Sequence, residues 1–184
     1  VARAQQDLPV QESKRAQAQQ DYNRIKPAYD QALRDYERAE DKSNRAQRSY
    51  ESDKRNYDWE MDKYQRFERE YSFARQRYDR AQSQARSYDS KAQREEGLIS
   101  SDPKNADTHR RNAADYRNKA QASRSEADRH RRDMDSARNN MDRQRWDVDR
   151  ARREMDGSQR QYWDARSEME SAKGTWQYKQ GELN

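Results

Sequence analysis

The stretch that decides the fold is residues 22–81, YNRIKPAYDQALRDYERAEDKSNRAQRSYESDKRNYDWEMDKYQRFEREYSFARQRYDRA. Tyrosine recurs every seven residues along it, and only Ser43 interrupts the series. A second series, three residues after each tyrosine, is mostly alanine and is interrupted by Asp53 and Glu60. We name the two series a and d, as in a heptad lettered a to g. Such a repeat predicts a helix that packs along a narrow seam, and its sustained period of seven predicts a left-handed coiled coil.

The larger seam residues predicted for this first arm are Tyr22, Tyr29, Tyr36, Tyr50, Tyr57, Tyr64, Phe67, Tyr71 and Tyr78. A second register of the same period runs from Ala106 to Leu183. Its larger predicted seam residues are Met134, Met141, Val148, Met155, Tyr162, Met169 and Trp176. A companion series lies three residues after each member, and three polar residues interrupt that companion series: His130, Gln144 and Ser158. The two registers predict two long helices.

Residues 97–102 separate the two registers. Gly97 is expected to take a left-handed conformation and end the first helix. Asp102 suits an N-cap and Pro103 the first position of the next helix. Because short connections favour antiparallel neighbours, we predict an all-α fold, a long antiparallel two-helix coiled-coil hairpin whose turn is centred near residue 100.

The predicted organisation is an irregular N-terminal segment over 1–12, a first helical arm over 13–96, a hairpin turn over 97–102 and a second helical arm over 103–182. Pro27 lies inside the first arm and leaves two alternatives open. The helix continues through a kink there, or the main arm starts near Pro27 after a separate short helix.

Composition agrees with a narrow seam rather than a globular core. Hydrophobic residues make up 29% of the chain and charged residues 41%, against roughly 45–50% and about 25% in typical soluble domains. The 40 basic and 35 acidic residues nearly balance, and 10% of residues are aromatic. Disordered chains normally have a high net charge and few aromatic residues, so long helices are favoured over disorder.

No residue pattern predicts an enzyme, and we expect no cofactor, metal or small-molecule substrate. There is no cysteine, and His109 and His130 lie three heptads apart, too far to share a metal ion. Arginine alternates with aspartate along both arms, and the most basic short stretch is Thr108-His109-Arg110-Arg111. We therefore expect neither a nucleic-acid footprint nor the broad apolar face of a membrane-surface helix.

Large aromatic residues outside the seam predict an interface instead. Trp59, Phe73, Trp146 and Trp163 lie at neither seam position, and aromatic residues are enriched at protein interfaces. Our leading hypothesis is a non-catalytic structural protein whose hairpins self-associate with other copies into a filament, sheath or coat.

The alternative is a monomeric or dimeric coiled-coil rod that acts as a spacer or docking arm. In that case Leu98 and Ile99 would contact a protein partner at the hairpin tip. The absence of cysteine and the first residue, Val1, slightly favour an exported protein, periplasmic or extracellular.

Overall fold

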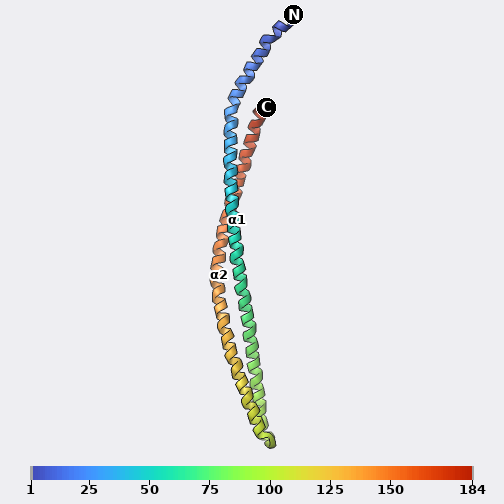
Figure 1. Ribbon diagram of the computed structural model, residues 1–184, viewed down its shortest axis with the longest axis vertical. Coiled ribbons are helices and arrows are strands. Elements are labelled where there is room, and N and C mark those ends of the chain that lie inside the picture. The colour runs from blue at the N-terminus through green and yellow to red at the C-terminus, as the bar shows by residue number, and fades with distance from the viewer. Residues whose placement is uncertain (1, 184) are drawn as a thin grey trace. The chain divides into compact units, whose positions relative to one another are not determined.

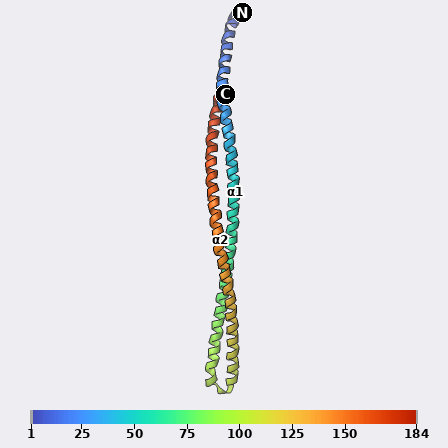
Figure 2. The same cartoon turned by 90° about the vertical axis from the view of Figure 1, so that its left-hand side faces the viewer.

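The computed structural model describes residues 2–183, and the side chains of residues 10–183. Helix α1 spans Ala2–Ser101, the short 3₁₀ helix η1 spans Pro103–Asn105, and α2 spans Ala106–Leu183. The two long helices run side by side in opposite directions and meet at the turn (Figures 1 and 2). The predicted all-α helical hairpin is confirmed.

The hairpin divides into two units. The turn unit is Tyr57–Arg150, and the terminal unit combines the described residues up to Asn56 with those from Ala151. Each unit contains a segment of α1 packed on a segment of α2.

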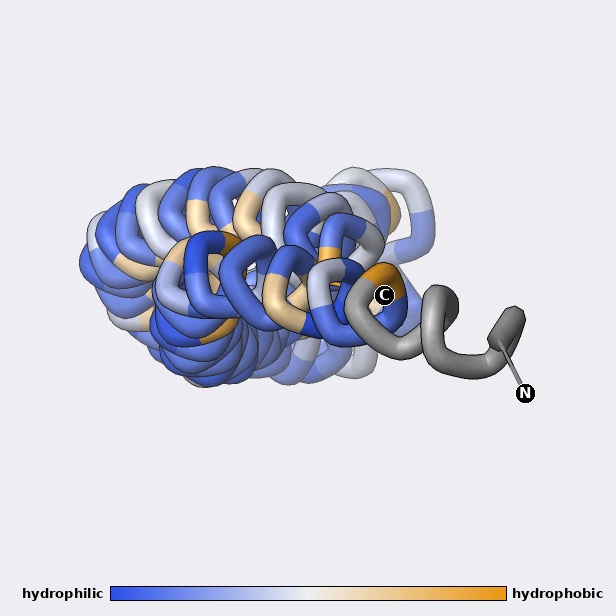
Figure 3. The backbone as a smooth tube through the Cα atoms, turned by 90° about the horizontal axis from the view of Figure 1, so that it is seen from above, coloured by the Kyte–Doolittle hydropathy of each residue, from blue (hydrophilic) through white to orange (hydrophobic). Residues whose placement is uncertain are grey.

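Burial in both units follows the heptad register. The buried apolar residues are Ala32, Ala74, Ala81, Ala85, Ala92, Ala113, Ala120, Ala127, Ala137, Val148, Ala151 and Ala165. All of them are at a or d, and all but one are alanine. The tyrosines from Tyr29 to Tyr78 at position a are half-buried, as are the seam methionines, Tyr162 and Trp176. Hydrophobic positions are correspondingly sparse along the backbone tube (Figure 3).

The N-terminal end of α1 differs from the sequence prediction. Residues 2–12, expected to be irregular, are helical, and α1 continues through both Pro9 and Pro27. Alanine, arginine and glutamine, all good helix formers, dominate residues 2–6 and 15–20, and each proline removes only one helical hydrogen bond.

Tyr22 was predicted to lie in the seam, but it is 41% exposed. Tyr36 stacks on Trp176 with ring centroids 5.3 Å apart. Tyr29 lies one heptad before Tyr36, and Leu183 lies one heptad after Trp176. Leu183 is therefore near the level of Tyr29. Tyr22 lies a further heptad on, where the described part of α2 offers it no partner.

The turn also differs in position. Gly97 has no positive φ and lies within α1, which ends only at Ser101. Asp102 leaves the helical region, with φ −130° and ψ 75°. The residue before a proline is disfavoured in the α region, and proline has no N–H to continue the ladder. Pro103 therefore ends the helix, and Gly97 does not.

Because the turn comes later in the sequence than predicted, each residue of α1 lies opposite a later residue of α2 than expected. In the turn unit, Tyr88 stacks on Tyr116 with centroids 6.3 Å apart and Asp89 pairs with Arg124, so the centre of the hairpin lies beyond residue 100. Tyr88 therefore faces another tyrosine across the hairpin. Lys91 and Lys119 flank this pair, each with its Nζ within 5.8 Å of the Tyr116 centroid.

Two of the polar seam residues meet each other in the turn unit. Gln144 Nε2 donates to the Glu60 main-chain oxygen at 3.1 Å and also to the Glu60 carboxylate. Lys63 Nζ lies 2.6 Å from the same carboxylate. Burial alone would raise the pKa of Glu60, but the hydrogen bonds from Lys63 and Gln144 outweigh it and hold that pKa below its ordinary value. The carboxylate is therefore charged and satisfied inside the seam.

This polar pair makes one alignment of the helices preferable. Sliding one helix by a heptad would leave a buried carboxylate without its amide donor, at a cost of about 1–3 kcal/mol. Buried polar pairs in coiled coils set register in this way, and they add little to net stability.

We predict that Gln144→Ala lowers the free energy of unfolding by about 1–3 kcal/mol, because Glu60 loses a buried donor. Urea unfolding followed by circular dichroism measures the change. Gln121→Ala, at an exposed position of the same helix, should change it by less than about 0.5 kcal/mol. Equal effects of the two substitutions would contradict the role given to the polar pair.

Candidate functional site

The four aromatic side chains singled out outside the seam are all solvent-exposed. Their exposed fractions are 58% for Trp59, 60% for Phe73, 75% for Trp146 and 54% for Trp163. The first three lie in the turn unit and Trp163 lies in the terminal unit. The chain thus holds large apolar surface outside its seam, on both helices.

Trp59 is held in place by the polar seam pair. Lys63 Nζ lies 3.6 Å from the centroid of the Trp59 ring, one helical turn away. The same ammonium group pairs with the Glu60 carboxylate. A cation over an indole face is favourable by about 0.5–1 kcal/mol at exposed sites. The buried carboxylate therefore positions Lys63, and Lys63 orients the exposed indole.

Trp163 packs partly on its neighbours. Its ring lies 5.4 Å from that of Tyr162, tilted by 48°, and Arg166 Cζ lies 5.5 Å from its centroid. Tyr178, which was not singled out from the sequence, is also 65% exposed. Tyr178 also lies outside a and d, so the same rule of position would have found it.

Leu98 and Ile99 lie in the last turn of α1 and are both half-buried. They were predicted within a connector between the helices. Ile99 continues the a series of α1, seven residues after Ala92. Its side chain therefore belongs to the seam, which leaves little apolar surface at the tip.

A titratable cluster closes the hairpin at the turn. His109 Nδ1 donates to Glu95 Oε2 at 2.7 Å, and Nε2 lies 3.6 Å from Asp102 Oδ2. Asn105 Nδ2 donates to the same Asp102 oxygen at 2.9 Å. The hydrogen bond to Glu95, opposed by burial and supported by Asp102, raises the pKa of His109 above its ordinary value. The pKa values of Glu95 and Asp102 are lowered, chiefly by their hydrogen bonds to His109 and Asn105 respectively.

The second histidine has no such partner. His130 is half-buried, with Glu126 and Asp133 carboxylates 3.7 and 3.6 Å from its two ring nitrogens. Over the described residues 2–183, no three His, Cys, Asp or Glu side chains cluster as they would to hold a metal ion.

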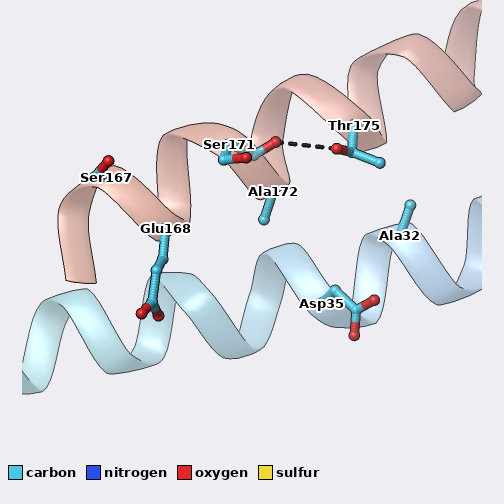
Figure 4. Close-up of a pocket in the computed structure, with 7 residues that line it drawn as sticks. All are labelled: Ala32, Asp35, Ser167, Glu168, Ser171, Ala172 and Thr175. Carbon is cyan, nitrogen blue, oxygen red and sulfur yellow. Dashed lines mark hydrogen bonds between the residues drawn. The ribbon is translucent and has the colours of Figure 1, made fainter. Parts of the chain in front are cut away.

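Surface grooves in both units lie between the helices, where small seam residues leave room. The groove in Figure 4, about 480 Å³ in volume, is lined by Ala32, Asp35, Ser167, Glu168, Ser171, Ala172 and Thr175. The one hydrogen bond among these residues, from Thr175 Oγ1 to the Ser171 main-chain oxygen, stays within α2. Glu168 instead pairs with Lys42 across the hairpin at 2.5 Å. These side chains form no pairing of a nucleophile with a base.

Comparison with protein-family models, with curated proteins and with solved structures finds no match. In the part of the chain that the structure describes, neither helix contains a stretch apolar enough to cross a bilayer. Functional inference for this chain therefore depends on its own residues.

The tip cluster predicts a pH dependence. A raised histidine pKa stabilises the fold fully below the ordinary value of 6.5, and the gain is lost as pH rises through the folded pKa. The lowered Glu95 pKa stabilises above 4.5, and that gain is lost as pH falls through the folded pKa. We expect the tip to be most stable between pH 4.5 and 6.5.

Amide hydrogen exchange of residues near the turn at pH 6 and pH 8, corrected for intrinsic exchange rates, measures this effect. Protection should fall at pH 8, and His109→Gln should remove most of the difference. An NMR titration placing the His109 pKa below 6.5 would contradict the assignment.

Proposed function

We propose that this chain is a non-catalytic structural protein whose helical hairpins self-associate into a filament, sheath or coat. The observation that carries the proposal is the set of exposed aromatic residues, between 54% and 75% exposed, in a chain with so little apolar material. Aromatic residues are enriched at protein interfaces, where their large apolar surface is buried.

The composition of the seam supports the same proposal. Alanine makes up all but one of the buried apolar residues, and no large side chain is fully buried in the described part of the chain. Long helices gain most of their stability from tertiary packing. An alanine seam buries little area per turn, so packing between copies would add stabilisation that the single hairpin lacks.

Magnitudes indicate that the aromatic residues need help from other contacts. Burying the exposed half of such a side chain contributes about 1–2 kcal/mol, or roughly 4–8 kcal/mol for four of them. Association costs an estimated 4–15 kcal/mol in lost translational and rotational freedom. The aromatic contacts alone are marginal, and repetition along an assembly or complementary charges would have to supplement them.

The alternative, a spacer or docking arm working through its tip, draws on Leu98 and Ile99. Both are half-buried within α1, which weakens it. The two proposals differ in a direct way, because a docking arm remains monomeric or dimeric at every concentration.

We predict that replacing Trp59 and Trp146 by serine raises the concentration needed for assembly more than tenfold. The loss of two apolar contacts of about 1–2 kcal/mol each exceeds the 1.4 kcal/mol that corresponds to tenfold. Sedimentation velocity and negative-stain electron microscopy measure the assembly, and circular dichroism checks that helicity is kept.

Tyr178→Ser serves as the control. It removes an aromatic side chain that is 65% exposed but lies in the terminal unit. It should shift the assembly concentration less than the double variant does. Unmodified protein that stays monomeric would remove the proposal, and equal assembly of the double variant would remove the role of Trp59 and Trp146.

A further inference from the structure

One face of α1 in the turn unit carries arginine and aromatic residues in alternation. Trp59, Arg66, Phe73 and Arg80 occupy the c position of four consecutive heptads. All four are exposed. We call them the basic–aromatic stripe. It spans 22 residues, or about 32 Å of helix.

On α2 of the same unit aspartate recurs at one heptad position, next to exposed arginines at the e position of the same heptads. Asp128, Asp135, Asp142 and Asp149 occupy the b position of four consecutive heptads, and all are exposed. We call them the acidic stripe. It also spans 22 residues. Trp146 lies beside it, four residues after Asp142 and three before Asp149.

Among the described residues, the charged side chains of both stripes have no ion-pair partner within the hairpin. Other charged residues pair across it: Arg124 binds Asp89 at 2.5 Å, and Arg117 binds Glu96. Among the described residues, neither arginine of the basic–aromatic stripe forms an ion pair within 4.0 Å. The same holds for the four aspartates of the acidic stripe.

The two stripes lie on opposite sides of the hairpin. Phe73 lines a groove together with Asp133 and Asn140 of α2. Asp128 lines a different groove, together with Asp89 and Arg124. In heptad terms the first groove is on the side of the g positions and the second on the side of the e positions. The stripes of one copy therefore point away from each other and cannot meet within the chain.

The stripes also lie at the same level along the hairpin. The pair Glu60–Gln144 places residue 144 level with residue 60. On that alignment Arg66 lies between the levels of Asp142 and Asp135, and Trp59 lies within two residues of the level of Trp146. Two parallel copies placed side by side without axial shift would therefore bring opposite charges together, and an indole next to an indole.

We infer that the basic–aromatic stripe of one copy binds the acidic stripe and Trp146 of a second copy of this chain. The inference rests on the proposed function and specifies its contact. Each of the two arginines meets aspartates, and Trp59 packs near Trp146 of the neighbouring hairpin. Complementary charges supply the register and specificity that the aromatic contacts alone lack.

Because the two stripes face opposite directions, the contact is heterologous and leaves one stripe free at each end. Each added copy presents the same free surface again, so growth follows one direction and does not close into a dimer. The contact also predicts weaker assembly at high salt, since exposed charge pairs are screened.

Reversing the charges tests the contact. One variant carries Arg66→Glu and Arg80→Glu, and the other carries Asp128→Arg, Asp135→Arg and Asp142→Arg, the aspartates level with the two arginines. In each variant alone the two stripes carry like charges, and the assembly concentration measured by sedimentation velocity should rise more than tenfold. In an equimolar mixture every contact between unlike copies is complementary again, so assembly should return to within about threefold of the unmodified protein.

Arg48→Glu with Arg55→Glu is the matched control for the variant at Arg66 and Arg80, with the same change in net charge at exposed positions of α1 in the terminal unit, outside both stripes. It should assemble nearly as the unmodified protein does. Circular dichroism confirms that each variant remains helical before its assembly is compared.

The outcomes separate this inference from the proposed function. Dispersed single variants and an assembling mixture support the contact. Unchanged assembly of either variant, or a mixture that stays dispersed, overturns the contact while self-association of the unmodified chain stands. An unmodified chain that stays monomeric, including one that binds only an added polyanion, overturns both.

Discussion

The alanine seam constrains the rest of this structure. Small side chains at a and d bring two helices together along a narrow line, and with 29% hydrophobic residues there is no material for a wider core. The helices must therefore be long, and their alignment must come from a few specific contacts. In the turn unit these are the buried Glu60–Gln144 pair, the Tyr88–Tyr116 stack and the ion pairs that cross the hairpin. The alignment in turn decides which side chains share a level on the outer faces.

The fold was predictable because a period of seven persists through both arms. The details that failed depend on local backbone chemistry and on helix length. Gly97 can end a helix, but nothing requires it to, whereas Pro103 cannot continue one and imposes its restriction on Asp102. Tyr22 continues the heptad pattern, but the described part of α2 does not extend to its level. Periodicity indicates which face could be buried, and only the length of the partner decides whether it is.

The candidate interface was partly predictable. Trp59, Phe73, Trp146 and Trp163 were identified because they lie outside a and d, and all four are exposed. The charge stripes were not identified, because arginine and aspartate alternate along the linear sequence and look evenly mixed. Assigning each residue its heptad position separates them, since Asp128, Asp135 and Asp142 recur at b while Arg66 and Arg80 recur at c. Which stripe faces which side follows only from the grooves and ion pairs of the folded hairpin.

Covalent trapping of neighbouring copies tests the central claim most directly. The chain has no cysteine, so thiols can be added only where wanted: Ser87→Cys at the c position of α1 and Gln121→Cys at the b position of α2, both exposed. The account predicts that a short thiol cross-linker converts the doubly substituted chain into a ladder of covalent oligomers. Either substitution alone should leave monomers, because like stripes do not face each other. A doubly substituted chain that stays monomeric under assembling conditions, or dimers from either single variant, would contradict the account.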